Sequence, residues 1–99
     1  MNRLRSLLLA GLCALAAGCA SNASDPRAGA ELAPTGKLRA AINFGNPVLA
    51  VRGANGEPHG VSVDLAREAA RRLGLPVELV TFNSAGNVVQ AVEARQVDL

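Results

Sequence analysis

The chain has 99 residues, a formal net charge of +2 and 18% charged side chains. Arg3 and Arg5 account for the excess positive charge, so the remainder shows no basic patch of the kind that binds nucleic acid, and we expect no nucleic-acid partner. A single histidine, His59, without a usable cysteine cannot form a metal cluster. No nucleophile–base motif or phosphate-binding loop is present. We therefore expect no cofactor and no enzyme activity.

Residues 1–18 have the features of an export signal. A basic start is followed by an apolar segment over residues 7–17, which is shorter than the ~20 apolar residues of a membrane-spanning helix. The sequence Leu-Ala-Ala-Gly-Cys at residues 15–19 resembles a bacterial lipobox, although Ala16 stands where leucine is most frequent. We predict lipidation at Cys19, hence a periplasmic protein anchored to a membrane; ordinary secretion with cleavage at a nearby small residue is the alternative.

Residues 19–35 are rich in Ala, Ser, Asn, Pro and Gly, and we interpret them as a flexible tether with room for a short helix around residues 28–32. A strand buried in a sheet is expected over residues 37–44. Asn55 and Gly56 are a strong tight-turn signal. They predict a small hairpin between residues 48–52 and 58–61.

The next segment has the periodicity of an amphipathic helix. Ser62 is a suitable N-cap, Glu68 can pair with Arg72 one turn later, and Gly74 provides a stop signal. Asp64, in the first helical turn, is expected to stabilise the helix dipole and not to act as a catalytic acid. The apolar face is predicted to contain Leu65, Ala66, Ala69, Ala70 and Leu73.

A second strand is expected at Val77–Phe82, followed by a second helix that Asn83 or Ser84 caps. The buried stripe of this helix is predicted to contain Ala85, Val88, Val89 and Val92. Residues 97–99 are typical of the opening of a third strand. Alternating strands and helices predict an α/β fold with a parallel sheet and right-handed crossovers.

The order of motifs resembles bacterial family 3 extracellular solute-binding proteins over residues 37–99. Gly60, Val63, Asp64 and Leu65 match the pattern that precedes the helix in that family, whereas the two residues at positions 61 and 62 depart from its aromatic and its acid. The resemblance implies a periplasmic-binding-protein-like (type II) fold with two lobes around a cleft. Residues 36–99 are then expected to be the N-terminal part of lobe one, with the chain ending inside it.

The same resemblance implies a function. The chain would be the substrate-binding component of an ABC-type importer, with a permease and its ATPase as partners and a small polar solute, such as an amino acid, as ligand. The alternative is an exported enzyme or sensor on the same fold, similar to cyclohexadienyl dehydratases or to the regulatory lobe of a lytic transglycosylase or sensor kinase. Fold alone does not separate these classes.

Ligands of parallel α/β sheets lie beyond the carboxyl ends of the strands, which points to two loops. The second loop also begins a helix, whose free amides suit an anion. The resemblance implies an aromatic side chain near Ala85, which is missing here. Core packing of the phenylalanines and turn or cap formation by the polar residues are the alternative roles. The candidate ligand-binding residues are Asn43, Phe44, Asn46, Phe82, Asn83, Ser84 and Asn87.

Lipidation has a direct test. Metabolic labelling with a radioactive fatty acid should mark the wild-type protein and leave the Cys19→Ser variant unmarked, because the thiol of Cys19 receives the diacylglycerol. Equal labelling of the two proteins, or none of either, would refute the lipid anchor.

Overall fold

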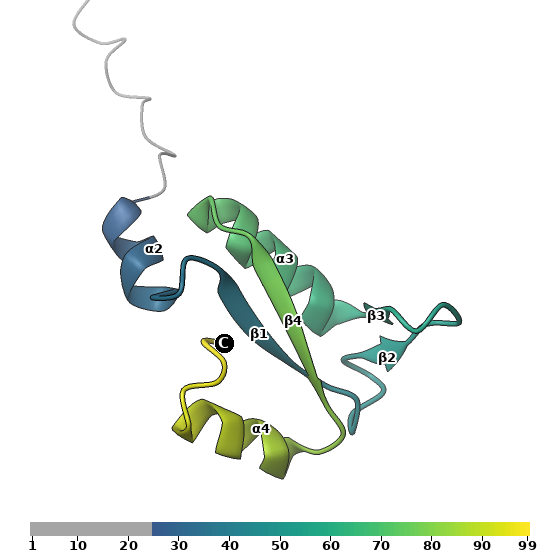
Figure 1. Ribbon diagram of the computed structural model, residues 1–99. Helices are drawn as coiled ribbons and strands as arrows, with labels where there is room; N and C mark the ends of the chain where they lie inside the picture. Colours follow the sequence, from purple (N-terminus) through teal and green to yellow (C-terminus); the bar gives the residue numbers. More distant parts are fainter. Residues whose placement is uncertain (1–24) are drawn as a thin grey trace, which may run out of the picture.

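The computed structural model describes residues 25–99, and the predicted signal peptide and Cys19 lie outside them. Within this part of the chain, no helix combines the length and the apolar character needed to cross a membrane. Figure 1 shows the arrangement of the elements. In chain order they are α2 (Pro26–Leu32), β1 (Leu38–Asn43), β2 (Val51–Arg52), β3 (Pro58–His59), α3 (Val61–Leu73), β4 (Val77–Phe82) and α4 (Ala85–Glu93).

Strands β1 and β4 form a parallel pair, with Leu38 opposite Val77 at one end and Asn43 opposite Phe82 at the other. The chain near its C-terminus also bonds to β1, beside which it lies in Figure 1. The Leu99 amide donates to the Arg39 carbonyl (3.2 Å) and the Leu99 carbonyl accepts from the Ala41 amide (2.7 Å), which is the bonding of a parallel ladder. The predicted parallel α/β fold is confirmed.

The predicted hairpin is present as the antiparallel pair β2–β3, with strands of two residues each.

The core is small and lies between the sheet and α3. Alternate residues of β1 are buried, as expected for a strand with one face on a helix. One cluster joins Ala33, just after α2, to Leu38 and Ala70. A second joins Ile42, Ala50 and Val63. Helix α2 thus lies inside the segment interpreted as a tether, and the residue that follows it packs into the core.

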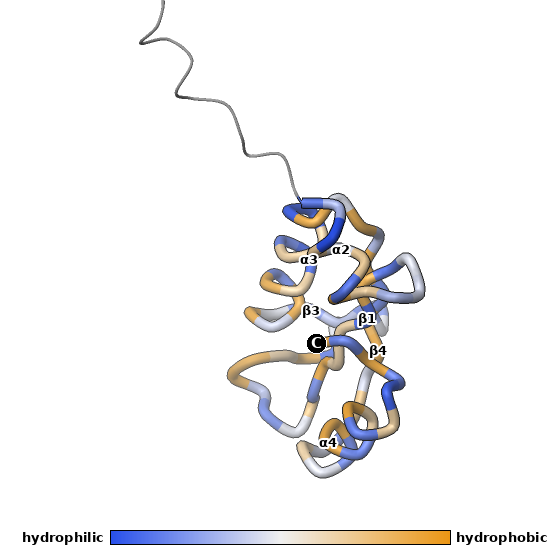
Figure 2. Tube along the Cα trace, turned by 90° about the vertical axis from the view of Figure 1, so that its left-hand side faces the viewer, coloured by the Kyte–Doolittle hydropathy of each residue, from blue (hydrophilic) through white to orange (hydrophobic). Residues whose placement is uncertain are grey.

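Helix α3 confirms part of its prediction and corrects the rest. Glu68 binds Arg72 at 2.8 Å, as predicted. It also binds Arg71 at 2.6 Å. The helix ends at Gly74 in the left-handed conformation. The predicted face is correct at Ala66 and Ala70, which are buried. It is wrong at Leu65, which is 65% exposed, and it omits Val63, which is buried. Figure 2 shows hydrophilic and hydrophobic segments alternating along α3.

The start of α3 is also different from the prediction, since the N-cap is Gly60 and not Ser62. Gly60 has φ 123° and ψ −177°, a region that is essentially restricted to glycine. A Cβ at this position would lie 2.7 Å from the Leu49 carbonyl oxygen. That same oxygen accepts a hydrogen bond from the Ser62 amide at 3.0 Å. Gly60 therefore lets the preceding loop close against the first turn of α3.

Helix α4 begins where the sequence indicates. Ser84 is its N-cap, and the hydroxyl oxygen accepts a hydrogen bond from the Asn87 amide at 3.3 Å. The predicted buried stripe is wrong, because Val89 and Val92 are about half exposed and Ala91 is the buried residue of the helix. Ala85 is exposed, and Val88 is half-buried. The small side chain of Ala91 lets the helix approach the sheet closely.

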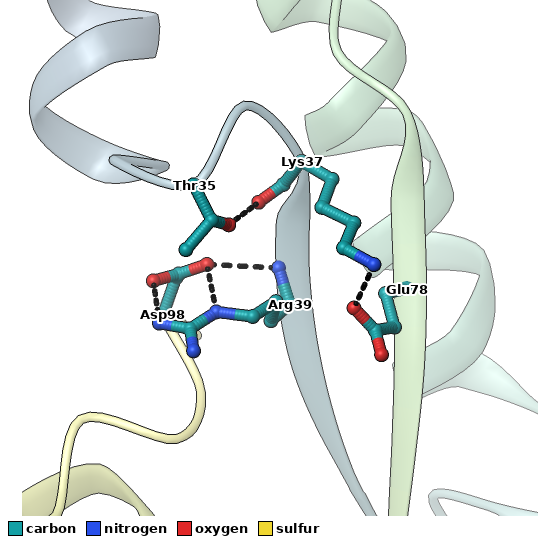
Figure 3. Close-up of polar contacts among 5 residues, drawn as sticks. All are labelled: Thr35, Lys37, Arg39, Glu78 and Asp98. Carbon is teal, nitrogen blue, oxygen red and sulfur yellow. Dashed lines mark hydrogen bonds and ion pairs between the residues drawn. The ribbon is translucent and has the colours of Figure 1, made fainter.

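Two ion pairs lie near the beginning of the strands (Figure 3). The Asp98 carboxylate accepts from the Arg39 guanidinium at 2.8 and 3.1 Å, and from the Arg39 backbone amide at 2.9 Å. The Asp98 side chain is 5% exposed. Lys37 and Glu78 pair at 2.8 Å on the surface between the two strands. The Asp98 carboxylate therefore fastens residues 97–99 to the edge of β1.

The requirement for glycine at position 60 is testable against a second glycine with positive φ. Gly60→Ala should lower the free energy of unfolding by about 2 kcal/mol or more, because it adds a close contact to a strained backbone. Gly56→Ala is the control, since Gly56 has φ 83° with nothing within 4 Å of a Cβ. It should cost about 1 kcal/mol from the backbone alone. Urea unfolding of both variants measures the difference, and equal losses would contradict the Leu49 contact.

The Arg39–Asp98 pair predicts a dependence of stability on acid. The Arg39 guanidinium holds the pKa of the Asp98 carboxyl below its ordinary value of 3.8. A carboxyl with a lowered folded-state pKa contributes stability that is complete above the unfolded pKa and is lost as the pH falls through the folded one. The free energy of unfolding should thus decline as the pH drops below about 4.

The control for this decline is Asp98→Asn, which should be less stable at neutral pH and should lose less on acidification. A smaller decline should remain, because Arg71 and Arg72 lower the pKa of Glu68 to about 2. Urea unfolding at several pH values measures the free energy of unfolding of the wild type and of Asp98→Asn. Identical acid slopes in the wild type and Asp98→Asn would show that the pair does not contribute.

Candidate functional site

The parallel register brings the two predicted loops to the same edge of the sheet. Asn43 and Phe82 are opposite each other at the carboxyl ends of β1 and β4. The Phe44 amide then donates to the Phe82 carbonyl at 2.8 Å. One residue further, a Cβ on Gly45 would lie 2.8 Å from the Asn83 carbonyl oxygen, so the loops touch through their backbones and only glycine fits. The candidate residues on both loops are therefore neighbours.

Two asparagines shape the first loop through their side chains. The Asn43 Oδ1 accepts from the Gly45 amide at 2.8 Å. The Asn46 Oδ1 accepts from the Val48 amide at 3.1 Å. Both are Asx turns, which is one of the two roles expected for these residues. Each turn uses the carbonyl oxygen of the side chain and leaves its NH₂ group as the remaining hydrogen-bonding group.

The second loop enters α4, whose first turn contains no acidic side chain. Ser84 caps the helix with its oxygen, so its hydroxyl proton is not used by the cap. Asn83, Ser84 and Asn87 are all exposed. The positive end of the helix dipole adds to these donors. The loop therefore presents hydrogen-bond donors at its surface, and the anion site predicted here stays a prediction.

The two phenylalanines occupy different positions at this edge. Phe44 packs against the cluster of Ile42, Ala50 and Val63. The Arg52 guanidinium carbon lies 4.6 Å from the centroid of its ring, within the range of a cation–π contact. Phe82 is half-buried at the end of β4. Phe44 is thus in contact with the core and with a cation.

Arg52 lies beside the candidate residue Phe44, and the sequence reasoning did not name it as a candidate. It belongs to β2, eight positions after Phe44, and its place over the ring depends on how the intervening loop folds. The adjacent Asn55–Gly56 turn signal indicated the hairpin but not the direction of this side chain. Among the described residues, no group of three or more histidine, cysteine, aspartate or glutamate side chains could hold a metal ion.

A parallel α/β unit whose loops meet beyond the carboxyl ends of the strands has the architecture of a ligand-binding lobe. The family model of bacterial extracellular solute-binding proteins, family 3, matches residues 38–99. The chain belongs to this family. A search of curated proteins and a search of solved structures each found no match.

Family membership gives the general activity. The family implies binding of a small solute by an extracellular or periplasmic protein. Most members are not enzymes, although enzyme members exist. The matched region begins at the first residue of β1 and includes the whole sheet, both candidate loops and α4.

Proposed function

We propose that this protein binds an amino acid or a related small polar solute at the carboxyl edge of β1 and β4, and delivers it to an ABC-type importer. The observation that carries the proposal is the meeting of the two loops at this edge, within a domain of the solute-binding family. The candidate residues Asn43, Asn46 and Ser84 would supply hydrogen bonds to the solute. Residues 36–99 would form the first part of one lobe.

The donors at this edge support a solute that carries a carboxylate. Asn43 and Asn46 direct their carbonyl oxygens to backbone amides, which leaves their NH₂ groups for a ligand. The first turn of α4 adds a hydroxyl and a positive helix end. An amino acid presents a carboxylate, which accepts several such hydrogen bonds at once.

The proposal includes the setting of the protein. The partners would be a membrane permease and its ATPase, with the solute-binding protein held by lipid at Cys19 in the periplasm. The protein would act by binding alone, without a chemical step. An exported enzyme on this fold would instead convert its ligand, so incubation with each bound solute followed by mass analysis separates the two classes. Recovery of a product would overturn the proposal of binding alone.

The role of Ser84 is the direct test of the site. In the full gene product, Ser84→Asp should preserve the melting temperature, because aspartate is a good N-cap. It should lower the affinity for the L-amino acid that binds best by about ten- to a hundredfold, because a carboxylate at this position repels the solute carboxylate. Calorimetric titration with each of the common L-amino acids identifies that ligand and measures the change.

Two further variants distinguish a ligand contact from a cap. Ser84→Thr keeps the hydroxyl and should keep the affinity. Ser84→Ala loses the cap and should cost about 1 kcal/mol of stability in addition to its effect on binding. Unchanged affinity in Ser84→Asp would rule out this loop as the place of the carboxylate and leave the loop from Asn43 to Asn46 as the site.

A further inference from the structure

We propose that Arg52 determines the charge of the solute, by binding a negatively charged group with a guanidinium that the Phe44 ring holds in place. The site would then select amino acids with a side-chain carboxylate over neutral and cationic ones. This inference rests on the proposed function, because it assumes that the solute lies at the carboxyl edge of the sheet.

The position of Arg52 is the first step. Its guanidinium carbon is 4.6 Å from the centroid of the Phe44 ring. Phe44 follows the last residue of β1, and its amide bonds to the last residue of β4. The cation is therefore one side chain away from the place where the two candidate loops meet. Contact between Phe44 and the buried cluster fixes the ring, and a fixed ring restricts the guanidinium over it.

The second step is that Arg52 has no acidic partner in residues 25–99, whereas several other cations do. Lys37 pairs with Glu78, and Arg39 pairs with Asp98. Arg71 and Arg72 share Glu68. Arg52 is exposed, and within residues 25–99 its guanidinium makes a cation–π contact with Phe44 and no ion pair. Its five N–H donors are available for a carboxylate, which a guanidinium binds in a bidentate manner.

The third step is the polarity of the two candidate loops near Arg52. The side chains of Asn43, Asn46 and Ser84 all direct an oxygen to a backbone amide and retain their donors. Neither residues 43–46 nor residues 82–87 include an aspartate or a glutamate. Arg52 therefore offers a cation, and the two loops offer hydrogen-bond donors. Neither loop contains an acid that could pair with a basic side chain. A solute with a second carboxylate complements this arrangement best.

The experiment compares two ligands of nearly equal size and different charge. Calorimetric titration of the full gene product with L-glutamate and L-glutamine should show at least about tenfold tighter binding of glutamate, and L-lysine should bind more weakly than either. Higher salt should weaken the binding of glutamate more than that of glutamine, because screening acts on the charge pair.

Variants then assign the preference to Arg52. Arg52→Met keeps the length and the apolar stem, and should lose about ten- to a hundredfold in affinity for glutamate with little change for glutamine. Arg52→Lys keeps the charge but loses the bidentate geometry, and should retain only part of the preference. Arg67→Gln removes an equal charge from the exposed side of α3 and should change neither affinity.

The outcomes separate this inference from the proposed function. Equal losses for glutamate and glutamine in Arg52→Met would show that Arg52 only supports Phe44, and the inference would fail while solute binding stands. The wild-type protein alone can also overturn the inference about Arg52. It does so if it prefers glutamine or lysine, or if salt weakens the binding of glutamate and glutamine equally. Failure of the wild type to bind any common amino acid would overturn the amino-acid proposal and this inference together.

Discussion

The parallel pairing of β1 with β4 is the constraint on which the rest of the structure depends. Because the register sets Asn43 opposite Phe82, both strands end at the same level and their loops leave the sheet side by side. A parallel pair needs a crossover, and α3 supplies it while covering the buried residues of β1. The meeting of the two candidate loops and the packing of the core thus both depend on this register.

The crossover also requires a glycine at position 60. The Leu49 carbonyl approaches the first turn of α3 so closely that no side chain fits on Gly60. That approach puts Ala50 in the core next to Val63, and β2 begins at the following residue. The guanidinium of Arg52 then lies over Phe44. A single glycine at a helix entry therefore contributes to the position of a cation at the edge of the sheet.

Local signals were sufficient for much of the fold. The bounds of β4 and the stop at Gly74 depend on residues close in sequence, and both were predicted correctly. The N-cap of α4 was narrowed to Asn83 or Ser84, and Ser84 is the cap. The buried faces of the helices were predicted less well. Leu65 and Val92 are apolar but exposed, because small alanines allow closer packing on the sheet. Apolar periodicity identifies a helix, but it does not show which of two adjacent apolar stripes packs against the sheet.

The long-range side-chain pairs could not be predicted from sequence. Arg39 and Asp98 are 59 positions apart, and they meet only because residues 97–99 return to the free edge of β1. Arg52 and Phe44 meet through the fold of the loop between them. The candidate loops themselves were found because a rule of topology, and not a local motif, places ligands beyond the carboxyl ends of parallel strands.

The distribution of charge follows from the same topology. Lys37 and Arg39 lie at the beginning of β1 with their acidic partners Glu78 and Asp98, so charge is neutralised at that end of the sheet. The carboxyl end has Arg52, the positive end of α4 and side chains that donate hydrogen bonds. The basic and acidic side chains balance over the region after the signal, but the ion pairs of the sheet lie at the beginning of its strands. Net charge does not show where the paired and unpaired charges lie, whereas the register of the strands shows which residues share each end of the sheet.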